Sequence, residues 1–160
     1  MKKYFGLPIV LLILGFAFFT PGCSTEASPA PEVSANHWFN TDSFSLADHS
    51  DKIVVLEFWA TWCPPCRRIK PHIKQLNGTY KDQGVVFVSI SNEDAQTVET
   101  FVNQSDMDWI VAAESSSGSD YNVSAIPAAF IVVDGMIVWS GNPAAGMDAE
   151  IERLVAERQN

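Results

Sequence analysis

IVVLEFWATWCPPC, residues 53–66, is the stretch of sequence that decides the fold. It begins with a short run of mostly β-branched, apolar and aromatic residues, which is typical of a buried central strand. Cys63 and Cys66 follow with Pro64 and Pro65 between them, and proline is well tolerated in the first turn of a helix. The stretch therefore predicts a buried strand that leads directly into a helix, with both cysteines at the helix start.

Strands and helices alternate in the rest of the chain. Apolar residues at helical spacing predict that the first helix runs from Pro64 to about Tyr80, with a kink at Pro71. The other predicted elements are strands at Ile53–Ala60, Val85–Ile90, Ala128–Val133 and Met136–Trp139, and helices at Ala95–Gln104 and Met147–Arg158. This order predicts an α/β sandwich with a mixed sheet, in which the last two strands form a hairpin.

Composition and charge limit the classes of protein and partner. A chain of 160 residues with 47% hydrophobic and 18% charged residues is typical of one folded domain with a real core. The net charge of −9 argues against nucleic acid and anionic lipid headgroups as partners. Three cysteines, one close pair and the isolated Cys23, do not form the disulfide framework of a small secreted scaffold.

Residues 1–22 are predicted to be an export signal of the lipoprotein type. Two lysines precede the uncharged apolar stretch Leu7–Phe19, which is shorter than the roughly 20 residues of a membrane span. Gly22 followed by Cys23 resembles the processing site of bacterial lipoproteins, where cleavage leaves the cysteine as the lipidated N-terminus. An uncleaved anchor, or a soluble form with Cys23 free, are the alternatives.

Residues 23–36 are expected to be a flexible tether, because they are rich in serine, alanine and proline and lack apolar periodicity. The folded domain is then expected at residues 37–160. Together with the export signal, this organisation predicts a membrane-anchored protein on the extracytoplasmic face of the bacterial cell envelope.

The spacing of Cys63 and Cys66 suits thiol–disulfide chemistry. Residues three apart share a helix face, so the two sulfurs can reach disulfide geometry. Free N–H groups and the helix dipole stabilise a thiolate at the first position, which makes Cys63 the expected nucleophile and Cys66 the resolving cysteine. Arg67 and Arg68 add positive charge nearby, or simply form a solvated helix face.

Two other kinds of site are weaker interpretations of the cysteine pair. A structural zinc site needs four ligands, and the sequence supplies only three scattered histidines besides this pair, so neither a metal nor a cofactor is expected. A peroxidatic cysteine would require Thr61 and a preceding proline at other spacings from Cys63.

Glu57 interrupts an apolar row. Alternation along the strand places it on one face with Ile53, Val55 and Trp59. Burial raises the pKa of a carboxyl group, so such a residue can hold or release a proton near neutral pH. The alternative is a carboxylate at the strand end that leans into solvent.

FWATWCPPC, residues 58–66, resembles the active-site segment of the thioredoxin superfamily and, within it, the exported TlpA/ResA-like disulfide reductases. The resemblance covers roughly residues 37–157 and includes YNVSAIP, residues 121–127, and the Asp134-Gly135 hairpin. It implies a thioredoxin fold, a three-layer sandwich with a central mixed sheet flanked by helices, and a thiol–disulfide oxidoreductase.

The resemblance also implies roles for residues outside the cysteine pair. Pro127 matches the cis-proline that faces the disulfide in this family, and the backbone of Ile126 would pair with an extended substrate segment. An ordinary proline at a strand start is the alternative for Pro127. Glu57 lies six residues before Cys63, where thioredoxins carry the buried acid that exchanges a proton with the second cysteine.

Trp62 is expected to cover the first cysteine, and with Pro64 and Pro65 it completes the expected substrate-binding surface. The other tryptophans, Trp109 among them, are expected to be packing residues. Many TlpA/ResA-like proteins carry a glutamate three residues after the second cysteine, where this chain has Ile69. That difference weakens any assignment to cytochrome c maturation.

The function expected from sequence is reduction of disulfides in envelope proteins or peptides. Its electrons would come from a membrane donor, because the exterior lacks a soluble reductant pool. An oxidant that installs disulfides, and a non-catalytic module that binds extended peptides, are the alternatives. Nothing in the sequence suggests an obligate dimer, so a monomer is expected.

Overall fold

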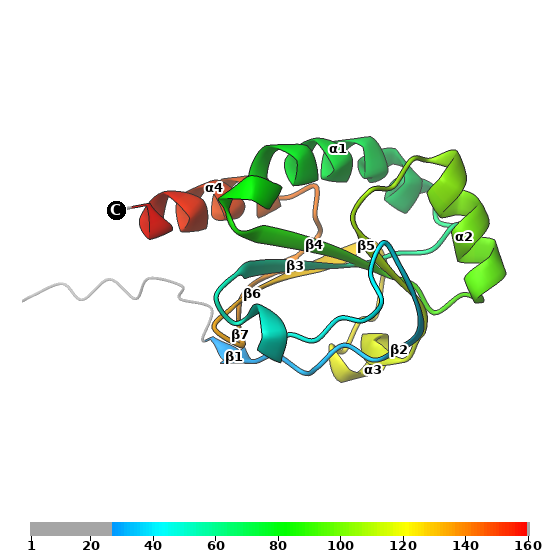
Figure 1. The fold of residues 1–160 in the computed structure, drawn as a ribbon, viewed down its shortest axis with the longest axis horizontal. Helices are drawn as coiled ribbons and strands as arrows, with labels where there is room; N and C mark the ends of the chain where they lie inside the picture. The colour runs from blue at the N-terminus through cyan, green and yellow to red at the C-terminus, as the bar shows by residue number, and fades with distance from the viewer. Residues whose placement is uncertain (1–26, 160) are drawn as a thin grey trace, which may run out of the picture.

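The computed structural model describes residues 27–159 of the chain (Figure 1). The predicted export signal and the lipidation site Cys23 lie outside the described residues. The strands are β1 Ser28–Pro29, β2 Ala35–Phe39, β3 Ile53–Phe58, β4 Val85–Ile90, β5 Ile110–Ser115, β6 Ala128–Val133 and β7 Met136–Gly141. The helices are α1 Pro64–Tyr80, α2 Ala95–Gln104, α3 Ser117–Asp120 and α4 Met147–Arg158, with two short 3-10 helices, η1 Ala47–His49 and η2 Lys81–Gln83.

One mixed sheet forms the centre of the described domain. Its seven strands follow the order β1-β7-β6-β3-β4-β5-β2. β3 pairs parallel with β4 and antiparallel with β6, and every residue of β3 is buried. Because β3 is apolar on both faces apart from Glu57, it occupies the middle of the sheet, as the sequence predicts.

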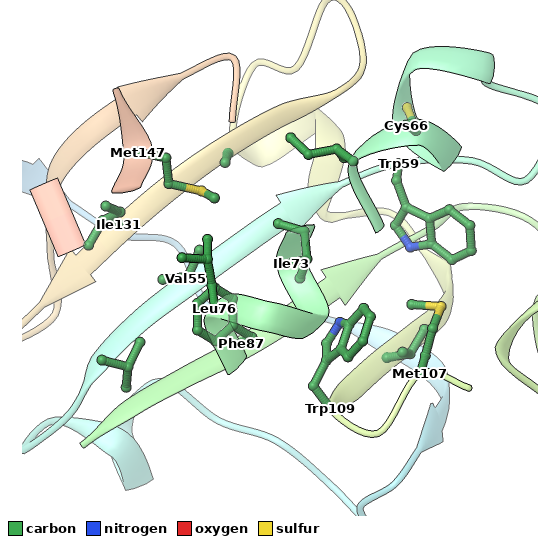
Figure 2. Packing of buried hydrophobic residues seen from close by; sticks show 14 of the residues in the cluster. Val55, Trp59, Cys66, Ile73, Leu76, Phe87, Met107, Trp109, Ile131 and Met147 are labelled. Carbon is green, nitrogen blue, oxygen red and sulfur yellow. The ribbon is translucent and has the colours of Figure 1, made fainter. Parts of the chain in front are cut away.

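The two faces of the sheet are covered differently. The three long helices, α1, α2 and α4, pack on one face, where their apolar side chains meet Val55 and Trp59 (Figures 1 and 2). The other face is covered by the segment before β3 and by the region around Tyr121, with the short helices η1 and α3 (Figure 1). The predicted helices flanking the sheet are therefore long on one face and short on the other.

The N-terminal part of the domain runs across the whole second face of the sheet. β1 lies at one edge, paired with β7, and β2 lies at the opposite edge, paired with β5 (Figure 1). Between the two strands, Val33 is buried in the second-face core, and the Tyr121 hydroxyl donates to the carbonyl oxygen of Pro31 (2.5 Å). We call residues 28–39 the N-terminal strap.

The N-terminal strap places the start of the folded domain earlier in the chain than expected. Residues 27–36 were expected to be flexible and to precede a domain that starts at residue 37, but the structure pairs or buries parts of this segment. Residues 27–36 show no apolar period because Val33 is their only large apolar side chain and their hydrogen bonds are made to distant strands. Residues 23–26 lie outside the described part. No helix among residues 27–159 has the length and apolar character to cross a membrane.

Candidate active site

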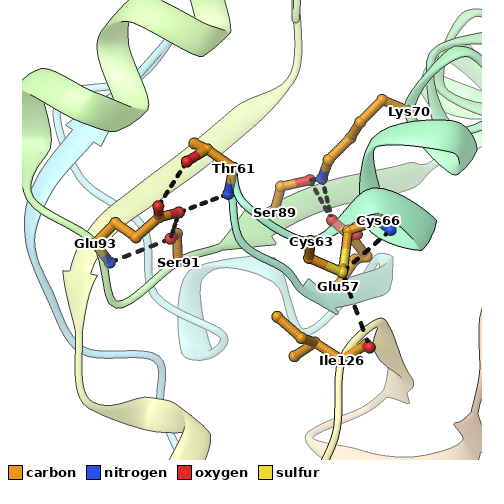
Figure 3. The surroundings of a disulfide bond; sticks show 9 residues. All are labelled: Glu57, Thr61, Cys63, Cys66, Lys70, Ser89, Ser91, Glu93 and Ile126. Atoms are coloured by element: carbon orange, nitrogen blue, oxygen red, sulfur yellow. Dashed lines mark hydrogen bonds and ion pairs between the residues drawn. A yellow bond between two sulfur atoms is a disulfide. The ribbon is translucent and has the colours of Figure 1, made fainter.

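The cysteine pair lies at the start of α1. Cys63 has an extended backbone and caps the helix, and its Sγ accepts a hydrogen bond from the Cys66 N–H (3.2 Å), while Pro64 and Pro65 occupy the first two helical positions. The two cysteines are joined in a disulfide with Cα atoms 5.3 Å apart (Figure 3). Cys66 is completely buried and Cys63 is 3% exposed, so Cys63 is the one nearer to solvent.

The Ile126–Pro127 segment faces the disulfide. The peptide bond between these residues is cis, which confirms the predicted cis conformation of Pro127. The carbonyl oxygen of Ile126 lies 3.9 Å from Cys63 Sγ (Figure 3). The fold thus brings together two predicted site segments that are 63 residues apart in sequence.

Two hollows adjoin this junction. The first, which we call the Ile126 groove, has a volume of about 510 Å³ and is lined by Trp62, Ile126 and residues of the 115–123 region, among others. The second, which we call the Arg68 cleft, has a volume of about 440 Å³ and lies between α1 and the loop after β7. Trp62 is 68% exposed, which is unusual for a large apolar side chain and leaves it available for contact.

Glu57 is buried on the helix-covered face of β3. Its side chain is 1% exposed, and its Oε2 accepts hydrogen bonds from Lys70 Nζ (2.5 Å) and Ser89 Oγ (2.8 Å). Its Oε1 is buried without a hydrogen-bond partner in the described structure. The predicted burial is confirmed, and the alternative of a carboxylate that leans into solvent is wrong.

Lys70 is a residue of this site that the sequence analysis missed. Burial lowers the pKa of Lys70 from 10.5 to about 8, because desolvation of the ammonium outweighs the attraction of Glu57. Its Nζ also lies 3.9 Å from the centre of the Trp59 ring, a cation–π contact. Helical spacing could have indicated its burial, because position 70 lies on the same face of α1 as Cys66, Ile73 and Asn77, which are all buried.

Ser89 and Trp109 complete the buried polar group. Ser89 Oγ accepts hydrogen bonds from Lys70 Nζ (3.2 Å) and from Trp109 Nε1 (2.8 Å), and it donates to Glu57. Trp109 was expected only to pack, but its indole N–H fixes the serine that holds the carboxylate. The Ser89 hydroxyl thus links the indole N–H to the ion pair, and its contacts with Glu57 and Lys70 are drawn in Figure 3.

A second carboxylate, Glu93, holds the loop before the cysteines. Its two oxygens accept hydrogen bonds from the Thr61 N–H (2.7 Å) and the Thr61 hydroxyl (2.6 Å), and Ser91 Oγ donates to it (3.0 Å). Glu93 follows β4, so it ties the strand after α1 to the loop that precedes α1 (Figure 3). This contact was not predicted, because no local sequence pattern indicates it.

Residues 27–159 contain no cluster of three or more histidine, cysteine, aspartate or glutamate residues arranged to hold a metal ion. The described site is instead a disulfide at a helix start, opposed by the Ile126–Pro127 backbone and backed by a buried carboxylate–ammonium pair. These parts can exchange a disulfide and can move a proton beneath it.

Comparison with known proteins agrees with this chemistry. A family model described as the AhpC/TSA family matches residues 27–140. The thiol–disulfide oxidoreductase ResA of Bacillus cereus is 30% identical over 142 residues, which cover 81% of this chain and 82% of that protein.

Solved structures agree with the fold. A thiol:disulfide interchange protein of the thioredoxin family from Chlorobium tepidum is 26% identical, with a TM-score of 0.62 over 72% of this chain and 87% of that one. The thioredoxin domain of a Bacteroides vulgatus thiol–disulfide oxidoreductase is 21% identical, with a TM-score of 0.70 over 80% of this chain and 96% of that one. The predicted thioredoxin fold is therefore confirmed.

Proposed function

The chain belongs to the AhpC/TSA family, and on that premise we propose that it is a thiol–disulfide oxidoreductase that reduces disulfides in proteins of the cell envelope. One observation carries the proposal: the Cys63–Cys66 disulfide at the start of α1 faces the Ile126–Pro127 backbone. A substrate chain laid along that backbone would bring its own disulfide to Cys63.

The reaction needs two exchange steps. In the reduced protein, the Cys63 thiolate attacks one sulfur of the substrate disulfide, and the other substrate sulfur leaves as a thiolate that takes up a proton. Cys66 then loses its proton and attacks Cys63 Sγ, which releases the second substrate thiol and forms the Cys63–Cys66 disulfide. Two electrons pass from the protein dithiol to the substrate.

Glu57 is proposed to take the proton from Cys66. Cys66 is completely buried, so its proton needs an acceptor inside the protein. Glu57 has one oxygen without a partner in the described residues, and Lys70, one helical turn after Cys66, can adjust its own proton because its pKa is about 8. We expect the pair to act together as the proton store of the second step.

The setting of the reaction is also a proposal. The lipoprotein-type leader and Cys23 support attachment to the outer side of a bacterial membrane through a lipid anchor, and the electrons would then come from a membrane donor. The protein would work as a monomer. Replacing Cys23 with serine in the full-length chain should abolish incorporation of labelled palmitate and release the protein from membranes.

A trapping experiment tests the exchange. Reduced Cys66→Ser protein, mixed with a disulfide-bonded test protein such as insulin, should accumulate a mixed disulfide that runs as a larger species on a non-reducing gel. Wild-type protein should complete the reduction. Cys63→Ser protein should neither form the mixed disulfide nor reduce the test protein. Reduction that persists in Cys63→Ser would refute the proposed nucleophile.

The reduction potential separates a reductant from the oxidant alternative. A potential near that of thioredoxin, roughly −270 mV, supports reduction of substrate disulfides, and one near −120 mV supports their formation. Equilibration of the oxidised protein with dithiothreitol or glutathione buffers measures it. Full activity of the wild type in the trapping experiment would also exclude a module that only binds peptides.

A further inference from the structure

The two hollows beside the disulfide differ in charge. The side chains that line the Ile126 groove are apolar or neutral, without one charged residue among them. The Arg68 cleft is lined by Arg68 and His72 from α1, together with Pro65, Ile69, Pro127 and residues of the loop after β7. The groove is therefore neutral, and the cleft carries a permanent positive charge.

The reactive centre lies between these hollows. Ile126 lines the groove, and its neighbour Pro127 lines the cleft. In the other wall, Trp62 lines the groove and Pro65 lines the cleft, with Cys63 between them in sequence. A substrate segment that crosses Cys63 would thus place residues before its reactive cysteine in one hollow and residues after it in the other.

Arg68 has no counter-charge within the described domain. Its side chain is exposed and, among residues 27–159, makes no hydrogen bond or ion pair, and the same is true of Arg67. Most other basic side chains do have a partner: Lys52, Lys70, Lys74, Arg153 and Arg158. The absence of internal pairing is notable in a chain with net charge −9.

The position of Arg68 on the helix gives no structural reason for its charge. The first turn of α1 contains no acidic side chain, and the dipole disfavours cations near a helix N-terminus. Arg68 and His72 share the helix face that borders the cleft, whereas Arg67 does not line it. His72 Nε2 donates to a carboxylate oxygen of Asp148 (2.7 Å), so that carboxylate is already engaged and Arg68 remains available.

We propose that the Arg68 cleft binds a carboxylate side chain of the substrate, on one side of the substrate's reactive cysteine, while the Ile126 groove takes an uncharged side chain from the other side. The guanidinium group supplies paired N–H donors that suit a carboxylate. This inference rests on the proposed exchange function and names a substrate class for it: disulfides with an acidic residue on one flank. Charge complementarity at the Arg68 cleft would favour such substrates, although this chain as a whole carries a net charge of −9.

Synthetic peptides can test this substrate preference. Each of four peptides carries one cysteine as a mixed disulfide with 2-thiopyridine, flanked by leucine on one side and by glutamate or glutamine on the other, in both orders. Attack of the Cys63 thiolate on the peptide sulfur forms the Cys63–peptide disulfide and releases 2-thiopyridone, whose absorbance gives the rate. The Glu/Gln rate ratio for each order isolates the effect of the carboxylate.

In one order only, the wild type should react about three- to fivefold faster with the glutamate peptide than with its glutamine twin at low salt, as expected of an exposed ion pair. The ratio should approach one in 0.5 M salt. Arg68→Gln should remove the preference, and the matched control Arg67→Gln should retain it. A role of Arg68 confined to stabilising the Cys63 thiolate would slow all four peptides alike and leave the ratio intact.

Three outcomes overturn the inference: a ratio of one in both orders, equal preference in both orders, or a preference that survives Arg68→Gln. In each of these the peptides still react, so the exchange function stands. A reduced protein that releases thiopyridone from none of the peptides would instead contradict the exchange function itself.

Discussion

At the scale of single residues, Glu57 carries the sharpest prediction. Glu57→Gln keeps the shape of the side chain but removes the proton acceptor proposed for Cys66. We expect the second exchange step to slow by at least about tenfold at pH 7, as for loss of a general base. Single-turnover measurements on the mixed disulfide of Cys63 would separate this step from the first.

The pH profile distinguishes a proton role of Glu57 from a structural one. The Glu57→Gln rate should rise steadily with pH, because Cys66 must then lose its proton to solvent, and Glu57→Asp should restore part of the neutral rate. Equal rates for wild type and Glu57→Gln at pH 7 would contradict the proposal.

Lys70 is predicted to stabilise the fold only as the partner of Glu57. Lys70→Met leaves a buried carboxylate without its cation, so the free energy of unfolding should fall by about 3 kcal/mol. The double variant Glu57→Leu/Lys70→Met removes both charges and should recover most of that loss. Urea unfolding of the oxidised proteins completes the double-mutant cycle. A double variant as unstable as the sum of both single variants would argue against coupling.

The titration of Lys70 predicts a specific pH dependence of stability. Its pKa falls from 10.5 to about 8 on folding, so the unfolded chain binds more protons there between pH 8 and pH 10.5. Stability rises with pH wherever the unfolded state binds more protons. Relative to Glu57→Leu/Lys70→Met, the wild type should therefore gain up to about 3 kcal/mol across this window and nothing below it. Urea unfolding from pH 7 to 10.5 measures the difference, and a level or falling curve contradicts it.

At the scale of elements, Glu93 joins β4 to the loop before α1. Glu93→Gln replaces charge-assisted hydrogen bonds to Thr61 with weaker ones, so the free energy of unfolding should fall by about 1–2 kcal/mol. Glu99→Gln, an exposed change on α2, is the matched control and should alter stability by less than about 0.5 kcal/mol. If the two changes have equal effects in urea unfolding, the hydrogen bonds from Thr61 to Glu93 add no stability beyond that of an exposed carboxylate.

The elements predicted from sequence are those with a local signal. The buried strand β3, the helix after the cysteines, α2 and the β6–β7 hairpin follow apolar periods or turn residues, and their bounds match closely. β5 was missed because it includes two alanines and a glutamate, and β2 was missed because Asn36 and His37 interrupt it. β5 pairs with β4 on one side and with β2 on the other, and a local sequence pattern does not report such partners.

The residues of the candidate site also divide into those that the sequence predicts and those that only the structure shows. Cys63, Cys66, Pro127 and the burial of Glu57 follow from spacing, alternation and resemblance. Lys70 and Glu93 were missed because a charged side chain in a sequence usually lies in solvent, and only the tertiary structure shows which ones turn inward.

At the scale of the whole molecule, the N-terminal strap is predicted to belong to the folded domain. A chain that begins at residue 37 loses the buried Val33 side chain and the Tyr121–Pro31 hydrogen bond, together with the pairing of β1. We expect its free energy of unfolding to be about 3 kcal/mol lower than that of a chain that begins at residue 27. Urea unfolding compares the two, and equal midpoints would show that residues 27–36 add no stability.

The strap supplies the outermost strand at both ends of the sheet, β1 beside β7 and β2 beside β5. Without it, both β7 and β5 would present rows of unpaired backbone N–H and C=O groups, which are templates for pairing with another molecule. One short segment thus protects two edges against aggregation. Its loss should therefore lower solubility at high protein concentration even under conditions in which the remaining domain stays folded.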